Sequence, residues 1–242
     1  MAKLIKIKGD ASFRSFFRKT NVKRNSIIVI AKKEKFKNLL VYDAINKILH
    51  KNKILAPHLY NENYSKNFIE IQDFGNKTLF DELNKKRKNK FFYFKKIIEL
   101  LIKIQSIKNR QINTFKKKKY LIPKYEKKIL IQEANLFCDW YVKNNFSKNE
   151  IEKFSKDFKK VMKNLASKLT LKENVFVHRD FHVSNLMLVK KNIGVIDSQD
   201  ALFGNRAYDL ASLIDDVRLK TSKSFKKKIF DYYLKKQKKK IS

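Results

Sequence analysis

The chain has 242 residues, 43% of them hydrophobic, which suits one globular unit of one or two lobes with a substantial core. It carries 58 Lys and Arg against 23 Asp and Glu, a formal charge of +35, but these cations are scattered and no nucleic-acid recognition motif accompanies them. We therefore expect no specific nucleic-acid partner, although anionic small molecules would be attracted to such a surface.

The cysteine content and hydropathy favour a cytoplasmic protein. The single cysteine, Cys138, excludes an internal disulfide framework and fits a reducing compartment. No apolar run approaches the ~20 residues that a membrane-spanning helix needs, and the opening MAKLIKIKGD has no apolar region of a secretory signal. We expect a monomer with no membrane association.

The first third of the chain is predicted to form short strands and one helix. The strands are expected at residues 4–7, 13–17, 27–30 and 68–71. The helix is expected at 39–49, and Gly75 is a natural hinge where the pattern changes period. We therefore expect a small α+β lobe over residues 1–75 and a second lobe over residues 76–242.

The second lobe is predicted to be mostly helical. Apolar residues recur at the 3.6-residue spacing over 94–104 and 151–169, and both stripes are expected to pack in the core. Three short β-like runs interrupt the helices, at 175–177, 186–189 and 193–196. The last two are predicted to form a β-hairpin.

Asp180, Asn185 and Asp197 form a pattern that suits phosphoryl transfer. Such a reaction needs a carboxylate to orient the acceptor hydroxyl and oxygen ligands to hold Mg²⁺ on the nucleotide phosphates. Asn185 follows Asp180 by five positions, and Asp197 lies at the end of the hairpin. Taken alone, Asp180 could cap a turn and Asp197 could simply end a strand. The combination favours a catalytic site.

HRDFHVSN at 178–185 with GVIDSQDALFGNRAYDLASLIDD at 194–216 resembles the aminoglycoside phosphotransferase and choline kinase superfamily. The resemblance implies a bilobal protein-kinase-like α+β fold: a small antiparallel-sheet N-lobe with one helix, and a mostly helical C-lobe with a catalytic hairpin. His182 matches the small-molecule branch. The sequence lacks an Ala-Pro-Glu segment and a G-x-G-x-x-G loop, so a protein substrate is not expected.

Further pieces resemble the bacterial amino-sugar kinases of cell-wall recycling. They are GDASFRSFFR at 9–18, QDFG at 72–75 and EANLFCDWYV at 133–142. The resemblance implies transfer from ATP, with Mg²⁺, to the anomeric hydroxyl of N-acetylmuramate or N-acetylglucosamine. The sugar 1-phosphate would feed peptidoglycan recycling.

By this resemblance, Asp180 is the catalytic base and Asn185 and Asp197 are the Mg²⁺ ligands. Asp200 matches a second acidic position that supports the metal or contacts the sugar. His178 is expected to brace the loop by hydrogen bonding rather than to react, and the roles of Arg179 and His182 stay open. Arg206 and Asp209 are expected to tie the loop to the next helix.

Ser12, Arg14, Arg18, Lys32 and Asp73 are the candidate nucleotide-binding residues. Ser12 lies in a turn of small residues that lets backbone N–H groups approach phosphates. Arg14 and Arg18 share a strand face and could reach the triphosphate, with a solvated face as the alternative. Lys32, or its neighbour, stands where protein kinases place a phosphate-binding lysine. Asp73 lies near the hinge, where backbone groups grip adenine.

For the acceptor, Glu133 and Trp140 are the candidates, together with Tyr141, because an aromatic face suits a pyranose. The alternative is that Trp140 is an ordinary core residue.

Two departures from the family leave alternatives open. Ser198 stands where the family has an aromatic residue, whose packing role Phe181 or Phe203 could fill. The chain also ends earlier than the family, so we expect either a pared-down acceptor lobe or a fragment. A kinase of choline, an aminoglycoside or another sugar, and a nucleotide-binding pseudokinase, remain alternatives, although the Asp-Asn-Asp set argues against the pseudokinase.

Overall fold

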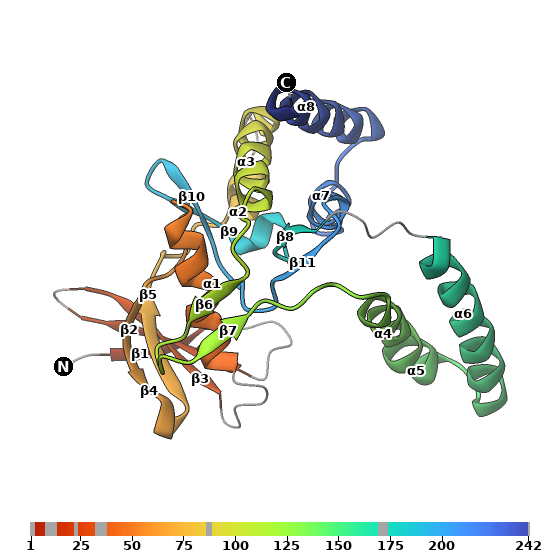
Figure 1. The fold of residues 1–242 in the computed structure, drawn as a ribbon, viewed down its shortest axis with the longest axis horizontal. Helices are drawn as coiled ribbons and strands as arrows, with labels where there is room; N and C mark the ends of the chain where they lie inside the picture. The colour runs from red at the N-terminus through yellow and green to blue at the C-terminus, as the bar shows by residue number, and fades with distance from the viewer. Residues whose placement is uncertain are drawn as a thin grey trace.

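The protein is described here from a computed structural model that covers residues 3–7, 14–21, 24–31, 38–85, 89–168 and 174–241. Figure 1 shows a sheet lobe, a helical lobe and a helical arm that projects from the second lobe. The bilobal α+β expectation is confirmed. Among the described residues, no helix is both long enough and apolar enough to cross a bilayer.

The N-lobe is a five-stranded antiparallel sheet in the order β1-β2-β3-β5-β4. The strands are β1 (Lys3–Ile7), β2 (Arg14–Thr20), β3 (Ser26–Ala31), β4 (Leu59–Asn63) and β5 (Phe68–Gln72). The four predicted strands are confirmed over their described residues. β4 was not predicted, because its sequence LYNEN is polar and carries no alternating apolar pattern.

Helix α1 (Asn38–Lys51) packs on the sheet and on the second lobe at once. Leu39 and Tyr42 belong to the apolar cluster of the sheet. Ile45, Ile48 and Leu49 belong instead to the large cluster of the C-lobe. The helix therefore connects the two cores.

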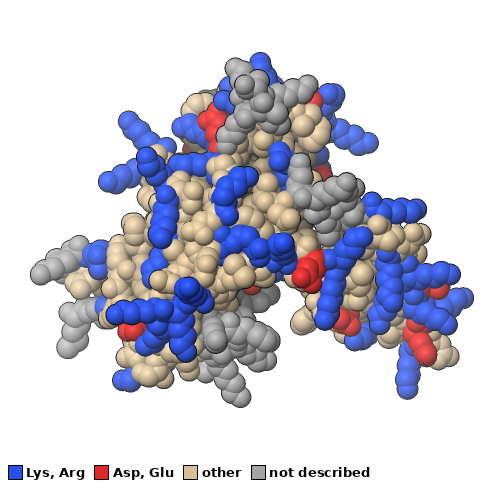
Figure 2. Space-filling view, viewed as in Figure 1, with Lys and Arg blue, Asp and Glu red and all other residues tan. Residues whose placement is uncertain are grey.

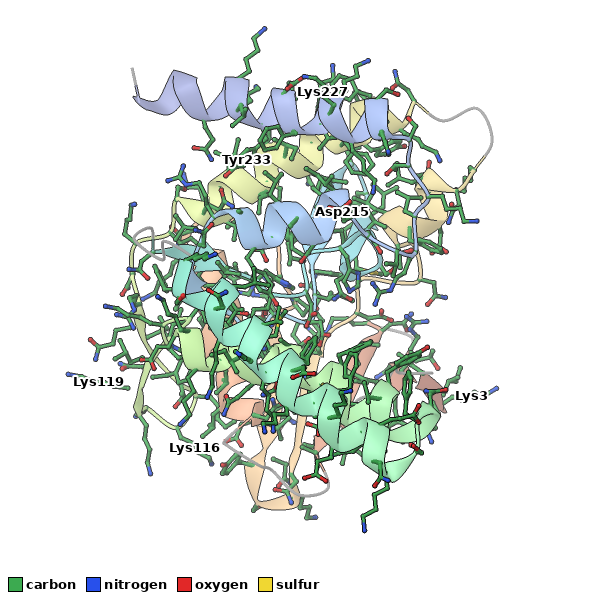
Figure 3. All side chains as sticks on the ribbon, turned by 90° about the vertical axis from the view of Figure 1, so that its right-hand side faces the viewer. Lys3, Lys116, Lys119, Asp215, Lys227 and Tyr233 are labelled. Carbon is green, nitrogen blue, oxygen red and sulfur yellow. The ribbon has the colours of Figure 1, made fainter. Side chains whose placement is uncertain are left out.

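The C-lobe core forms around α3 (Lys90–Gln105), whose predicted apolar stripe is fully buried at Phe94, Ile97 and Leu101. The lobe begins with α2 (Leu79–Leu83), which a capping box at Thr78 starts. Figure 3 shows α8 (Lys223–Ile241) lying across the lobe, and its Tyr233 hydroxyl donates to Gln105 Oε1 at 2.7 Å.

Short strands in the C-lobe flank the candidate site residues Asp180, Asn185 and Asp197. β9 (Leu186–Val189) and β10 (Asn192–Val195) form the predicted hairpin, with Asn192 opposite Val189. Two further strand pairs and one helix belong to this lobe. They are β8 (Val175–Val177) paired with β11 (Leu202–Gly204), β6 (Gln111–Asn113) paired with β7 (Lys119–Leu121), and α7 (Ala207–Ile214).

The arm consists of α4 (Lys127–Phe137), a π-helical turn (Cys138–Val142), α5 (Lys143–Asn145) and α6 (Lys148–Lys168). The prediction that the 151–169 stripe packs in the core is wrong over its described part. Only Ala166 of α6 is buried, while Val161 and Leu165 are about half exposed. α6 packs mainly against α4, so one neighbour covers only part of its apolar face.

The basic residues are spread over the visible face of both lobes and of the arm (Figure 2). On this face the basic residues therefore do not form a single compact patch.

Candidate functional site

A cavity of about 780 Å³ lies between the sheet and the C-lobe hairpin. Apolar side chains of both lobes line one part of it, among them Ile27, Ile71, Met187 and Ile196. Polar side chains line the other part, and they include Asp180, Asn185, Asp197 and Asp200. A cavity with apolar and acidic parts can take a planar base and a cation-bound phosphate chain together.

The loop after β8 is held by Asp209 of α7. Its buried carboxylate accepts the backbone N–H of His178 at 2.7 Å and of Arg179 at 3.0 Å. Arg179 has φ 76°, a left-handed conformation that costs energy in a non-glycine residue. The two hydrogen bonds fix this bend immediately before Asp180, so the expectation that Asp209 ties the loop to the next helix is confirmed.

Arg206 lies immediately before α7. Its guanidinium donates to Gln237 at 3.3 Å, and its carbonyl accepts from Gln105 at 2.9 Å. These contacts join the start of α7 to α8 and α3, and the role of Arg206 at the loop stays a prediction.

The environment of Asp180 suits a base. Partial burial raises the pKa of this carboxyl, and the charges of Asp197 and Asp200 raise it further, against the opposing charges of Arg179 and Arg218. A raised pKa makes the ionised carboxylate a stronger proton acceptor.

Asn185 and Asp197 present oxygens that fit Mg²⁺. The Asn185 amide nitrogen donates to the Asp180 carbonyl at 3.1 Å, which leaves Oδ1 as its ligand atom. Asp197 has φ 61° and accepts from Gln199 at 3.1 Å and from Arg14 at 3.2 Å, both at Oδ1. No cluster of three or more His, Cys, Asp or Glu able to hold a metal occurs in the described part of the chain. Asn185 and Asp197 nevertheless suit Mg²⁺, because proteins commonly bind this ion through one or two carboxylates plus substrate phosphates.

Asp200 stands beside this pair. Its carboxylate accepts from Gln199 Nε2 at 2.8 Å, and the same nitrogen donates to Asp197. Gln199 thus links the two acidic residues and holds both at the cavity wall.

The two histidines between β8 and β9, His178 and His182, differ in burial. His178 is fully buried with its ring edge-on to Phe181 at 6.0 Å, and burial lowers its pKa to about 4. It is therefore neutral and packed, and its expected hydrogen bonding to the loop stays a prediction. His182 lines the cavity with Nε2 3.2 Å from the Asn185 amide nitrogen, and burial and Arg218 lower its pKa.

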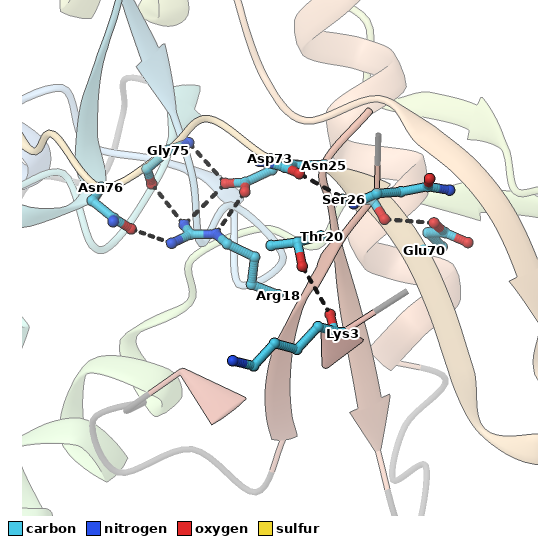
Figure 4. A network of polar contacts seen from close by, with 10 residues as sticks. Lys3, Arg18, Thr20, Asn25, Ser26, Glu70, Asp73, Gly75 and Asn76 are labelled. Carbon is cyan, nitrogen blue, oxygen red and sulfur yellow. Dashed lines mark hydrogen bonds and ion pairs between the residues drawn. The ribbon is translucent and has the colours of Figure 1, made fainter. Parts of the chain in front are cut away.

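In the N-lobe, Arg18 is bound to the interlobe segment (Figure 4). It donates to both Asp73 oxygens at 2.6 and 3.1 Å, to the Gly75 carbonyl at 3.1 Å and to Asn76. Asp73 also accepts the Gly75 N–H at 2.8 Å. The Arg18 guanidinium and the Asp73 carboxylate thus bind each other here, so their nucleotide contacts stay a prediction.

Ser12 and Lys32, together with Lys33, lie outside the described residues.

The two acceptor candidates lie in different surroundings. Glu133 contacts the catalytic loop: its carboxylate pairs with Arg179 and accepts from the hydroxyls of Tyr125 and Tyr208. Trp140 is 73% exposed on the arm and is not among the residues that line the cavity. The alternative that Trp140 is a core residue is wrong, while the acceptor roles stay predictions.

Comparison with known families places the molecule. The model of the phosphotransferase enzyme family matches residues 3–240. The chain belongs to that family. Its curated relatives include the N-acetylmuramate/N-acetylglucosamine kinases of Neisseria meningitidis, 26% identical over 219 residues, and of Pseudomonas aeruginosa, 27% identical over 216. The matches cover 89% of this chain but 62% and 60% of those proteins, so the chain spans about three-fifths of their length.

Solved structures of the same fold include small-molecule kinases. ADP-bound aminoglycoside phosphotransferase APH(2'')-Ib superposes with a TM-score of 0.64 at 16% identity, over 96% of this chain and 77% of that one. Plasmodium vivax ethanolamine kinase superposes with a TM-score of 0.63 at 17% identity, over 96% and 67%. The predicted superfamily resemblance is confirmed.

Sequence reasoning missed one part of this phosphotransferase site. Ser198 is fully buried and donates to Asn46 Oδ1 of α1 at 2.7 Å, and Asn46 also donates to the Pro57 carbonyl at 3.0 Å. Tyr42, one turn earlier on α1, lines the cavity. The i, i+4 spacing of Tyr42 and Asn46 on an otherwise apolar helix face was the available signal. The serine that departs from the family pattern thus connects the two lobes through hydrogen bonding.

Proposed function

We propose that this chain is an ATP- and Mg²⁺-dependent kinase that phosphorylates the anomeric hydroxyl of N-acetylmuramate or N-acetylglucosamine in the cytoplasm. The observation that carries the proposal is the set of Asp180, Asn185 and Asp197 gathered on the wall of one cavity with an apolar part. The names of the curated relatives support the choice of substrate. The monomeric state and the absence of a specific nucleic-acid partner stay predictions.

In this reaction Asp180 accepts a hydrogen bond from the sugar hydroxyl and takes its proton. The sugar oxygen forms a bond to the γ-phosphorus as the bond from that phosphorus to the β,γ-bridging oxygen breaks, so ADP leaves. Asn185 and Asp197 would hold Mg²⁺, which supplies positive charge to the phosphate oxygens. The raised pKa of Asp180 assists the proton transfer.

The charge of the protein bears on the acceptor class. A formal charge of +35 disfavours cationic acceptors such as choline or aminoglycosides, and it favours the carboxylate of muramate. The same charge attracts ATP whichever sugar is bound.

The test is a coupled ATP assay of the purified chain against N-acetylmuramate, N-acetylglucosamine, glucose, choline and kanamycin. We expect turnover of the amino sugars and a fall of about 10²–10⁴-fold in Asp180→Asn. Asp231→Asn is the matched control, because this exposed residue forms a surface pair with Lys227 and with no other described residue. Amino-sugar turnover that survives Asp180→Asn, or turnover of choline or kanamycin alone, would overturn the proposal.

A further inference from the structure

Arg14 reaches from the sheet lobe to the catalytic side of the cavity. Its Nη2 lies 3.2 Å from Asp197 Oδ1, between residues 183 positions apart in the chain. The side chain is only 7% exposed, and its guanidinium carbon lies 5.7 Å from the centre of the Phe16 ring. The Arg14 side chain is thus buried, and its ion pair with Asp197 joins the two lobes.

The carboxylate in this pair is the one expected to bind a divalent cation. A guanidinium and a metal ion that approach one carboxylate repel each other and compete for its charge. Asp197 also accepts from Gln199 at the same oxygen that Arg14 contacts. The Arg14 guanidinium therefore already offsets part of the negative charge of Asp197.

Another hydrogen bond between the lobes is of a different kind. Ser198, one residue after Asp197, donates to Asn46 in a neutral and buried hydrogen bond. Because neither partner is charged, a cation has no charge to compete for there. This bond can therefore stay in place while the neighbouring ion pair opens.

Arg14 has an obvious second partner. It lines the cavity alongside Asp180 and Asp197, so phosphate oxygens held there by a cation would lie next to its guanidinium. A guanidinium binds phosphate in a two-pronged geometry that a single contact to a carboxylate does not use.

We propose that Arg14 is a gate residue: it pairs with Asp197 before a metal–nucleotide complex enters and transfers to the nucleotide phosphates when that complex binds. The inference rests on the proposed kinase function and deepens it. No covalent step is involved; one ion pair is exchanged for another. Arg14 thus disfavours binding of the metal alone and favours binding of metal and nucleotide together.

The test measures binding rather than turnover, with Mn²⁺ as a spectroscopic probe in 0.15 M salt. In Arg14→Met, which keeps an apolar stem against Phe16, we expect Mn²⁺ without nucleotide to bind about two- to tenfold more tightly, because its competitor is gone. The same variant should bind Mn²⁺·ADP about tenfold or more weakly, because a charged phosphate contact is lost. Arg14→Lys should fall between, since it keeps the charge without the fork.

Two controls separate this exchange from a general charge effect. Arg218→Met removes a positive charge from the same cavity, but from a residue paired with Asp216 rather than Asp197. In an Asp197→Asn background, Arg14→Met should no longer alter Mn²⁺ affinity. Circular dichroism checks that each variant is folded.

Opposite signs for metal alone and metal–nucleotide, seen in Arg14→Met and absent in Arg218→Met, support the gate. Equal changes in the two variants, or weaker Mn²⁺ binding in Arg14→Met, overturn the gate and leave the kinase proposal intact. A wild-type chain that binds neither Mn²⁺·ADP nor ATP overturns both proposals.

Discussion

Replacing Asp209 with Asn is expected to destabilise the fold and displace the catalytic loop. In the wild type each carboxylate oxygen accepts one backbone N–H, from His178 and from Arg179. Asn keeps one acceptor and turns an amide NH₂ toward the other N–H. At pH 8, above the folded-state pKa of Asp209, the lost bond to a charged group costs about 1.5–3 kcal/mol, and the buried N–H without an acceptor costs about 1–3 kcal/mol more.

The total at that pH, about 2.5–6 kcal/mol, corresponds to a fall in Tm of roughly 5–24 °C for a chain of this size. Urea unfolding followed by circular dichroism measures it. Asp215→Asn is the matched control: its carboxylate is 68% exposed and pairs only with Lys226 in the described residues, so we expect a change below about 0.5 kcal/mol. Turnover of Asp209→Asn should also fall, because Arg179 no longer has its bend fixed next to Asp180.

The loss should depend on pH. Burial raises the pKa of Asp209 from 3.8 to about 7 in the folded protein. The folded state therefore binds more protons than the unfolded state between these values, so this group's contribution is full below pH 4 and lost as pH rises to 7. The variant lacks it, so the destabilisation at pH 5 should exceed that at pH 8 by on the order of 2–3 kcal/mol. Burial lowers the pKa of His178 to about 4, so the contribution of this residue has the opposite pH dependence.

Three results would refute this reasoning. They are an Asp209→Asn protein as stable as Asp215→Asn, a destabilisation that grows from pH 5 to pH 8, and full turnover in a destabilised variant. The first would remove the role of the two hydrogen bonds, the second the effect of burial, and the third the link between loop geometry and catalysis.

Three further substitutions test other parts of the site. Asp200→Asn should lower the pKa of Asp180, so the acidic limb of the kcat/KM profile moves to lower pH; a limb that stays fixed contradicts the charge coupling. Ser198→Ala leaves a buried acceptor unpaired on α1 and should cost about 1–3 kcal/mol in urea unfolding, with a loss under 0.5 kcal/mol arguing against the cross-lobe bond. In Gly194→Ala the new Cβ would lie 2.6 Å from the Phe74 ring in the cavity wall, so we expect a cost of about 1–3 kcal/mol and weaker nucleotide binding by calorimetry; unchanged binding would show that Phe74 yields freely.

The parts of the fold that sequence reasoning predicted are those with a strong local pattern. β3 (Ser26–Ala31) is a run of β-branched residues, and the stripe of α3 faces a complete core. β4 escaped prediction because an edge strand can be polar. α6 shows the opposite error: its stripe predicts an apolar face correctly, but the amount of chain that covers that face is a tertiary property.

The candidate site divides in the same way. Asp180 and Asn185 lie in one loop, so their spacing alone brings them together. The partners of Arg14 and Arg18 lie 183 and 55 positions away in the chain. Strand periodicity predicts the face of the sheet on which an arginine lies, but it does not predict which distant residue the arginine binds. Arg18 binds Asp73 in the segment between the lobes, and only the folded sheet brings Asp73 next to β2; its contact with phosphate stays a prediction.

Residue 75 divides the two lobes along the chain, but helix α1 makes the stability of each lobe depend on the other. Ile45, Ile48 and Leu49 lie in the same buried cluster as Phe94 and the other core residues of the C-lobe. A chain cut at 75 would expose that face of the helix to water and take three large apolar side chains out of the remaining lobe. Neither half is therefore an autonomous folding unit, and the two lobes should melt in a single cooperative transition.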